Sequence, residues 1–448
     1  MRKVLAASAI LIVVLLVISV FTVLSIEWGN REVAEKQGIF VGVTYCGDSV
    51  AGGKLLIDKV KHYTNLFVLQ SASLQRDFES VDELGDYAVK SGMYFLPYFG
   101  VYVEPTFSDW VASANQSWGD HFLGVYYSDE PGGKMLDANV QFDDNATGNS
   151  IIKTTYGDVV LQMANGTVIQ YEINGGIIHL SEPAYNNNNS TFYSTFYPNG
   201  TITGQLSDQS SFKTYQDLMN LKPLKNNDEA AQTFLSNYQN QLEPLKNNSK
   251  IFTSDYALYS WDYLSGYDVV LAQIGWNLTV NQQISLVRGA ATVQNKDWGI
   301  VITWKYEQPP YLDNASVILD QMRTAYQCGA KYFVLFNYYG SDQNPYGTLT
   351  DEDFQALQSF WNNVVNNPKV IQGSIKADSV VILPQNYGWG ARWDTDHIWG
   401  IFAADNETEQ YWSLIQTTLQ AHGLKTDIVY EDQEFPLPAT YQNIYRSG

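Results

Sequence analysis

The stretch that decides the fold is residues 122–133, which read Phe-Leu-Gly-Val-Tyr-Tyr-Ser-Asp-Glu-Pro-Gly-Gly. Its apolar and aromatic first half has the composition of a short β-strand. Pro131 cannot donate the backbone hydrogen bond that would extend the strand, so the strand ends at two neighbouring carboxylates, Asp129 and Glu130. Because α/β enzymes place their chemistry at the carboxyl ends of parallel strands, this stretch predicts an active site in an α/β fold.

Strand and helix patterns alternate on both sides of this stretch. Near-continuous apolar runs, typical of strands buried on both faces, occupy 39–45, 65–70, 93–99, 251–256, 268–275, 299–304 and 332–337. Helical patterns separate them, as at 53–62, 228–245 and 316–328. Thr350 and Asp353 predict a capping box before one more helix. With the opening stretch as the fourth strand, the sequence predicts an α/β fold, a (β/α)8 TIM barrel over residues 38–366.

Residues 134–226 interrupt this alternation. Short segments at 158–163, 167–173 and 176–180 are joined by Asn-Gly pairs, which favour tight turns between antiparallel strands. We therefore expect a β-rich insertion after the fourth strand, on the barrel face that carries the active site in this fold.

A linker after the barrel leads to a third part of the chain, residues 377–448. A strand at 380–383, a helix at 408–422 and a strand at 428–430 predict a short Rossmann-like αβ unit at the C-terminus. This unit is too small for a free-standing domain, so we expect it to pack on the barrel.

The N-terminal segment, residues 1–37, is predicted to be a signal anchor with a polar lead-in. Arg2 and Lys3 precede an uncharged run at 4–26, which is long enough for a transmembrane helix of about 20 residues. Basic residues before the run place the main domains outside the cell, anchored in the membrane. A cleaved signal peptide and a secreted protein are the alternative.

The amino-acid composition of the chain limits the classes of partner that it can bind. Hydrophobic residues make up 45% of the chain and charged residues 16%, as in a globular protein. The formal net charge of -21 argues against nucleic acid as a partner. The histidines show no metal-binding spacing, and we predict no metal and no cofactor.

External location agrees with N-glycosylation sequons, several of them in the insertion. They lie at Asn115, Asn145, Asn165, Asn188, Asn189, Asn199, Asn247, Asn277, Asn314 and Asn406. The two cysteines, Cys46 and Cys328, fall at opposite ends of predicted barrel strands, so we expect them to stay unpaired.

The barrel segments resemble the glycoside hydrolase-like TIM barrels of the clan that holds β-galactosidases and cellulases. The C-terminal part, with Leu383-Pro-Gln-Asn-Tyr-Gly-Trp-Gly390 and Asp427-Ile-Val-Tyr430, resembles the Rossmann-like trimerisation domain that follows such barrels in β-galactosidases. The resemblance implies an acid/base carboxylate at the end of the fourth strand and a nucleophile at the end of the seventh. Glu130 and Glu307 match these positions. The same resemblance implies that the chain could form a homo-oligomer.

Glycoside hydrolysis needs one protonated and one ionised carboxyl group, and these residue types suit that chemistry. Strand alternation points Glu130 into the barrel and leaves Asp129 as a supporting acid, while Lys305 would keep Glu307 ionised. Asp129, Asp255 and Asp262 are possible alternative carboxylates, and Asp255 and Asp262 could instead bind sugar hydroxyls.

Polar and aromatic residues at predicted strand ends are candidate substrate-binding groups, since sugar C–H faces stack on aromatic rings. They are Tyr45, Tyr259, Trp261, Gln273, Trp276, Trp304, Tyr306, Asn337 and Tyr338. Our leading hypothesis is thus an enzyme that hydrolyses O-glycosidic bonds of extracellular glycans. The alternative is a non-catalytic carbohydrate-binding or cell-envelope structural protein on a degenerate barrel.

Overall fold

The computed structural model describes residues 38–100, 107–137, 141–144, 149–153, 159–162, 168–171, 178–183, 191–197, 199–205, 214, 226–246, 248–276, 278–339 and 344–447. The predicted signal anchor at 4–26 lies outside these ranges. Within them, no helix has the length and apolar character needed to cross a bilayer.

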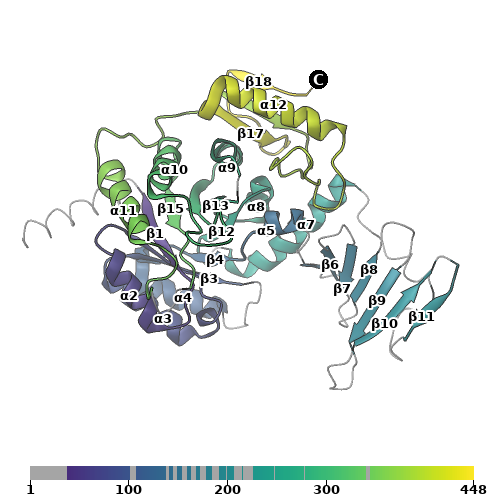
Figure 1. Cartoon of the computed structure of the whole chain (residues 1–448), viewed down its shortest axis with the longest axis horizontal. Coiled ribbons are helices and arrows are strands. Elements are labelled where there is room, and N and C mark those ends of the chain that lie inside the picture. The colour runs from purple at the N-terminus through teal and green to yellow at the C-terminus, as the bar shows by residue number, and fades with distance from the viewer. Residues whose placement is uncertain are drawn as a thin grey trace, which may run out of the picture. The chain divides into compact units, whose positions relative to one another are not determined.

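Parallel strands close into the predicted (β/α)8 barrel (Figure 1), in the order β1-β15-β14-β13-β12-β4-β3-β2. Their bounds are β1 Phe40–Tyr45, β2 Leu66–Leu69, β3 Tyr94–Phe99, β4 Val125–Tyr127, β12 Ile251–Asp255, β13 Val269–Ile274, β14 Asp297–Ile302 and β15 Tyr332–Leu335. Each predicted barrel strand overlaps one of these. The opening stretch is the fourth strand in chain order, and β14 is the seventh.

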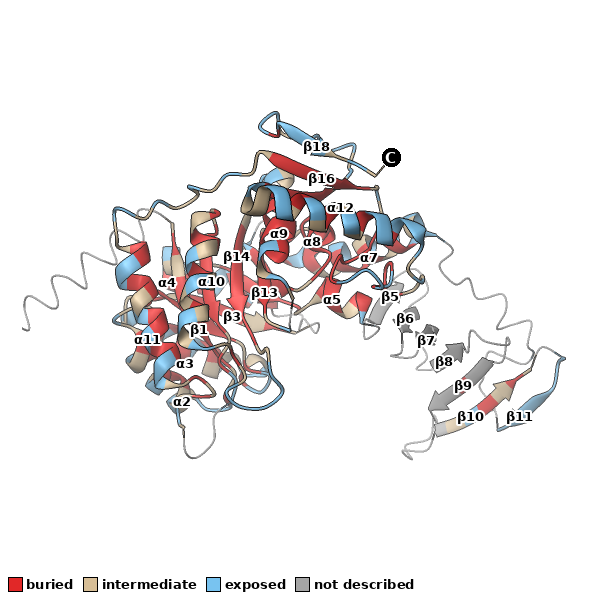
Figure 2. Cartoon of the chain, turned by 45° about the horizontal axis from the view of Figure 1, so that its top comes forward, coloured by how far each residue is buried: buried red, intermediate tan, exposed pale blue. Residues whose placement is uncertain are grey.

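Helices follow the strands, and most of the barrel strands are buried along their length (Figure 2). The helices are α2 Val50–Val60, α3 Phe78–Lys90, α4 Phe107–Trp118, α5 Pro131–Leu136, α7 Asn227–Leu242, α8 Tyr259–Ser265, α9 Val280–Gln294, α10 Ala315–Gln327 and α11 Asp351–Phe360. Local sequence explains their starts: Thr350 and Asp353 form the predicted capping box of α11, and Asn314 caps α10.

The described chain divides into two compact units. Unit 1 holds Met1–Phe99, Asp109–Val125 and Gly299–Ser374, and unit 2 holds Gly100–Ser108, Tyr126–Trp298 and Ile375–Gly448. In unit 1, the side chains of α2, α3, α10 and α11 pack on strands of the barrel, as where Phe333 of β15 meets Phe360 of α11 with ring centroids 4.8 Å apart. Neither Cys46 nor Cys328 forms a disulfide bond among the described residues.

The insertion after α5 contains a seven-stranded antiparallel sheet in the order β11-β10-β9-β8-β7-β6-β5. Its strands are β5 Gln141–Asp144, β6 Asn149–Lys153, β7 Val159–Gln162, β8 Val168–Tyr171, β9 Ile178–Pro183, β10 Thr191–Phe196 and β11 Ile202–Gly204. Consecutive strands are neighbours throughout, which is the expected result of short strands joined by tight turns. The three strands predicted at 158–180 correspond to β7, β8 and β9.

The C-terminal residues form a three-stranded parallel sheet in the order β17-β16-β18. Its elements are β16 Ser379–Leu383, α12 Asn406–His422, β17 Thr426–Tyr430 and β18 Asn443–Tyr445. The β16–α12–β17 connection is a parallel βαβ unit; the closer likeness to a Rossmann-like trimerisation domain stays a prediction.

This small sheet packs on barrel helix α9, as expected for a part too small to fold alone. Arg288 of α9 is buried, and its Nε binds Asp427 Oδ1 of β17 at 2.7 Å. Its Nη2 donates to the carbonyls of Leu424 and Thr426 at 2.7 and 3.0 Å. This buried ion pair joins α9 to the C-terminal sheet, and Val293 of α9 packs against the apolar cluster of that sheet, so the two share a core within unit 2.

Of the predicted glycosylation sites, Asn115, Asn199, Asn314 and Asn406 lie among the described residues, and Asn199, Asn314 and Asn406 are exposed there. Asn115 is half-buried and its side chain donates to the carbonyl of Val111. Asn145, Asn165, Asn188, Asn189, Asn247 and Asn277 lie outside the described residues.

Candidate active site

Glu130 lies in a turn at the carboxyl end of β4, in unit 2. β4 ends at Tyr127, and both Ser128 and Glu130 have a left-handed backbone, with φ of 55° and 58°. The turn is held against β12, because Glu130 N donates to the Ser254 carbonyl at 2.9 Å and Thr253 Oγ1 donates to the Ser128 carbonyl at 3.1 Å. Left-handed non-glycine residues are strained and gather at functional sites, which marks this turn for closer study.

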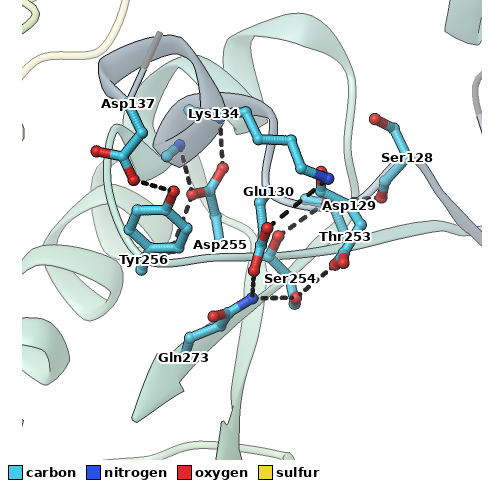
Figure 3. A network of polar contacts seen from close by, with 12 residues as sticks. Ser128, Asp129, Glu130, Lys134, Asp137, Thr253, Ser254, Asp255, Tyr256 and Gln273 are labelled. Atoms are coloured by element: carbon cyan, nitrogen blue, oxygen red, sulfur yellow. Dashed lines mark hydrogen bonds and ion pairs between the residues drawn. The ribbon is translucent and has the colours of Figure 1, made fainter. Parts of the chain in front are cut away.

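The carboxyl group of Glu130 is held by a side chain from another strand (Figure 3). Gln273 Nε2 of β13 donates to Glu130 Oε1 at 2.7 Å, and Lys134 Nζ lies 3.7 Å from Oε2. Burial raises the pKa of Glu130 and the negative charge of Asp129 raises it further, whereas Lys134 and Gln273 lower it in part. The side chain is still 21% exposed, so Glu130 is an accessible acid whose pKa lies above its ordinary value.

Asp129 is joined to this arrangement by hydrogen bonds. Its Oδ1 accepts hydrogen bonds from the hydroxyls of Tyr126 and Ser254. Ser254 Oγ is in turn 3.1 Å from Gln273 Nε2, so the network joins Asp129 to the amide that holds Glu130. Lys134 Nζ donates to the Asp129 carbonyl at 2.7 Å, which fixes the lysine close to both acids.

Trp276 follows β13 and brings an aromatic ring to the same place. Its Nε1 donates to Gln273 Oε1 at 3.0 Å, so both ends of the Gln273 amide are occupied. The ring is 44% exposed, and its backbone is also left-handed, with φ of 51°. An open indole ring near a carboxyl group with a raised pKa is suited to a sugar, whose C–H face stacks on the ring while a leaving oxygen accepts a proton.

Asp255 and Asp262 cannot serve as second carboxylates or sugar ligands, because both are fully buried. Asp255 accepts the backbone N–H groups of Gly132 and Gly133 at 2.5 and 2.8 Å, and so caps α5. A side chain at Gly133 would clash, since a Cβ there would lie 2.2 Å from Tyr256 Cζ. Burial raises the pKa of Asp255 to about 7. Glu130 is the N-cap residue of α5, but its side chain makes no cap hydrogen bond, so Asp255 supplies the side-chain cap of this helix.

Asp262 lies beside Asp255 with neither carboxyl oxygen accepting a hydrogen bond from the described residues. Burial raises the pKa of Asp262, and the charge of Asp255 raises it further. The two acids interact inside unit 2, and neither is exposed to a substrate.

The predictions that Tyr259 and Trp261 bind substrate are also wrong, because both rings are buried. Tyr259 donates from its hydroxyl to Gln283 Oε1 of α9. Trp261 packs edge-on against Tyr430 of the C-terminal sheet, with ring centroids 4.2 Å apart. These two aromatics follow a barrel strand, but they start α8 and face the helix layer.

Tyr45 and Asn337 of unit 1 have structural roles as well. Tyr45 is 7% exposed and donates to the Ser49 carbonyl at 2.6 Å, at the start of α2. Asn337 is 1% exposed; its Nδ2 donates to the Tyr346 carbonyl and its Oδ1 accepts from Leu349 N. The predictions that Tyr45 and Asn337 bind substrate are therefore wrong, because both side chains are buried.

In unit 1, exposed aromatics gather after β14 and β15. Tyr306 and Tyr338 are 46% and 48% exposed, and Trp304 meets Tyr338 edge-on with ring centroids 5.4 Å apart. Glu307 is exposed on the loop after β14. Lys305 does not pair with it as predicted, because its Nζ binds Asp313 Oδ1 at 2.8 Å.

Sequence reasoning missed Lys134, Ser254 and Tyr126 as parts of the site. Lys134 could have been found, since it lies four residues after Glu130 on a helix that starts with Pro131. Ser254 and Tyr126 carry no such signal, because only the closing of the barrel brings β4, β12 and β13 together.

No protein-family model matches the chain, and no curated protein matches it. Among solved structures it is similar to a GH39 β-xylosidase from Caulobacter crescentus, with 10% identity over 72% of this chain and 70% of that one and a TM-score of 0.35. The β-glycosidase BGL167 matches with 10% identity over 73% and 97% and a TM-score of 0.34. An HpcH/HpaI aldolase from Desulfitobacterium hafniense DCB-2 matches with 11% identity over 67% and 87% and a TM-score of 0.29. All of these TM-scores are low.

Proposed function

We propose that this chain is a glycoside hydrolase-like enzyme that hydrolyses O-glycosidic bonds of extracellular glycans, with Glu130 as the general acid. The observation that carries the proposal is the state of Glu130: an accessible carboxyl group with a raised pKa, at the end of the fourth barrel strand, beside the exposed ring of Trp276. Acids of this kind are what glycosidic cleavage requires.

The chemistry follows from that state. Glu130 transfers its proton to the glycosidic oxygen as the bond from that oxygen to the anomeric carbon breaks, and becomes a carboxylate. Gln273 and Lys134 then stabilise the new charge, because both already face the carboxyl group with N–H donors. Trp276 holds the sugar face.

We propose Glu307 as the second carboxylate, because it follows the seventh strand of the barrel. It is exposed, and would either take a proton from the attacking water or attack the anomeric carbon itself. In the second case water would then break the glycosyl–Glu307 ester, giving its proton to the Glu130 carboxylate and restoring both acids.

Turnover of aryl-glycosides and cell-surface polysaccharides by matched variants tests the proposal. We expect Glu130→Gln to lose at least about a hundredfold in kcat, because general acid catalysis contributes roughly that much or more. Glu307→Gln should lose as much, whereas Glu434→Gln, an exposed acid of the C-terminal part, should match the wild type. Equal turnover by Glu130→Gln and wild type would exclude Glu130 as the acid. Glycan binding without turnover by the wild type would favour the non-catalytic carbohydrate-binding alternative.

We further propose that residues 4–26 anchor the chain and leave the main domains at the cell surface. The uncharged run and the exposed sequons at Asn199, Asn314 and Asn406 support this. Protease treatment of intact cells should digest the main domains. Full protection from protease, with release only on lysis, would contradict it.

A further inference from the structure

A second exposed tryptophan in unit 2, Trp393, lies on a rigid support. The guanidinium of Arg392 is stacked on its ring, with Cζ 4.6 Å from the ring centroid. Trp393 itself is 43% exposed, the same degree as Trp276. An exposed indole ring held on a fixed guanidinium offers an apolar face on which a sugar can stack.

Arg392 is held from three sides. Its Nε and Nη2 bind Asp396 at 2.8 and 2.7 Å, and its Nη1 binds Asp137 at 2.7 Å. Arg392 Cζ also lies 5.5 Å from the centroid of the Tyr256 ring. The buried guanidinium thus contacts both rings, and two carboxylates against one cation leave this place unsuited to an anionic ligand.

This stack begins next to the candidate active site. Tyr256 directly follows Asp255 and donates from its hydroxyl to Asp137 Oδ2 at 2.5 Å (Figure 3). Asp137 is the C-cap of α5, whose N-cap is Glu130. α5 is six residues long, so about 9 Å of helix separates the acid from the stack.

The loop that carries Trp393 is fixed against the same helix. A Cβ at Gly400, which has a φ of 62°, would lie 2.2 Å from the Met135 carbonyl oxygen, so the loop touches the α5 backbone. The contact with α5 therefore fixes the position of the Trp393 loop relative to Glu130.

We propose that Trp393 is a remote sugar-binding subsite, a stacking platform for a neutral pyranose unit of the same glycan chain whose bond Glu130 cleaves. This inference rests on the proposed function and deepens it: the substrate is an oligosaccharide or polysaccharide, and the C-terminal part contributes to its binding. Arg392 acts as the positioning residue. Asp137 and Asp396 fix its guanidinium, and the guanidinium in turn holds the indole ring of Trp393.

Oligosaccharide binding by the full chain carrying Glu130→Gln, which blocks turnover, tests this subsite. The probes are β-linked gluco-, xylo- and galacto-oligosaccharides of increasing length, titrated calorimetrically. In this Glu130→Gln background, Trp393→Ala should weaken binding of the longest oligosaccharides about tenfold, because one stacking contact of about 1.4 kcal/mol is lost. Binding of the shortest oligosaccharides should not change. Trp393→Phe should keep most of the affinity, and Tyr193→Ala, an exposed aromatic of the antiparallel sheet, should keep all of it.

Equal affinity of Trp393→Ala for every length would overturn the subsite, and so would a chain that binds none of the probes. The proposed function fails separately, when wild type binds these oligosaccharides but cleaves none of them. Loss of binding by Trp393→Ala together with a lowered melting temperature would also count against the subsite unless Trp393→Phe restores both.

Discussion

Gln273 and Glu130 come from strands that are not neighbours, yet Gln273 Nε2 donates to Glu130 Oε1 at 2.7 Å. β12 lies between β4 and β13 in the barrel, so the hydrogen bond spans one whole strand at the barrel's end. It can do so because the left-handed turn at Ser128 and Glu130 bends the chain away from the direction of β4. The acid is therefore placed over the barrel end by a turn, and held there by an amide that is itself fixed by Trp276.

Trp276→Ala should raise KM for a glycan substrate about tenfold, because an exposed platform and the donor that fixes Gln273 are lost together. kcat/KM measured on an aryl-glycoside series reports the change. Tyr339→Ala removes another exposed aromatic and serves as the comparison. An unchanged KM in Trp276→Ala would show that the ring does not contact the sugar.

Lys134→Met should move the alkaline limb of the pH–activity profile to higher pH. The Lys134 charge lowers the pKa of Glu130, so its removal raises that pKa and keeps the acid protonated over a wider range. The pH dependence of kcat/KM measures this, with Lys90→Met, an exposed lysine paired with Asp86, as control. A shift toward lower pH would contradict the assignment of Glu130 as the proton donor.

Asp262→Asn should make the protein more stable than wild type at neutral and higher pH. The folded state raises the pKa of Asp262 above the ordinary value of 3.8, so folding binds a proton and the free energy of unfolding falls as pH rises from that value. Removing one such group should lessen the fall by up to about 1.4 kcal/mol per pH unit. The free energy of unfolding in urea, measured from pH 3.8 upward, tests this prediction. Asp320→Asn, which removes an exposed acid, is the control. Parallel curves for Asp262→Asn and wild type would refute a raised pKa at this residue.

Arg288→Met should destabilise the chain by about 3–5 kcal/mol, because it leaves Asp427 buried without its cation. Arg446→Met breaks an exposed pair with Glu431 and should cost less than about 1 kcal/mol. Chemical unfolding followed by tryptophan fluorescence separates the two. Equal losses from both variants would mean that the α9 contact does not hold the C-terminal sheet on the barrel.

The alternation of apolar strands and amphipathic helices was enough to predict the barrel, because burial on both faces of a strand leaves a run that local sequence displays. Turn pairs such as Asn165-Gly166 likewise predicted antiparallel strands in the insertion. The prediction that aromatic residues at strand ends bind substrate was much less successful. Tyr259 and Trp261 follow a strand as Trp276 does, but whether a ring faces solvent or the helix layer depends on the backbone of the turn.

The sequence by itself determined the fold class and the position of Glu130 at the end of the fourth strand, since both follow from hydrophobic pattern and from Pro131. Only the tertiary structure decided that Gln273 and Trp276 hold this acid, that Asp255 caps α5, and that Asp262 is buried without a cation. The physical reason is that pKa and exposure depend on which distant strands approach one another. Closing the barrel sets those distances, and no local pattern encodes them.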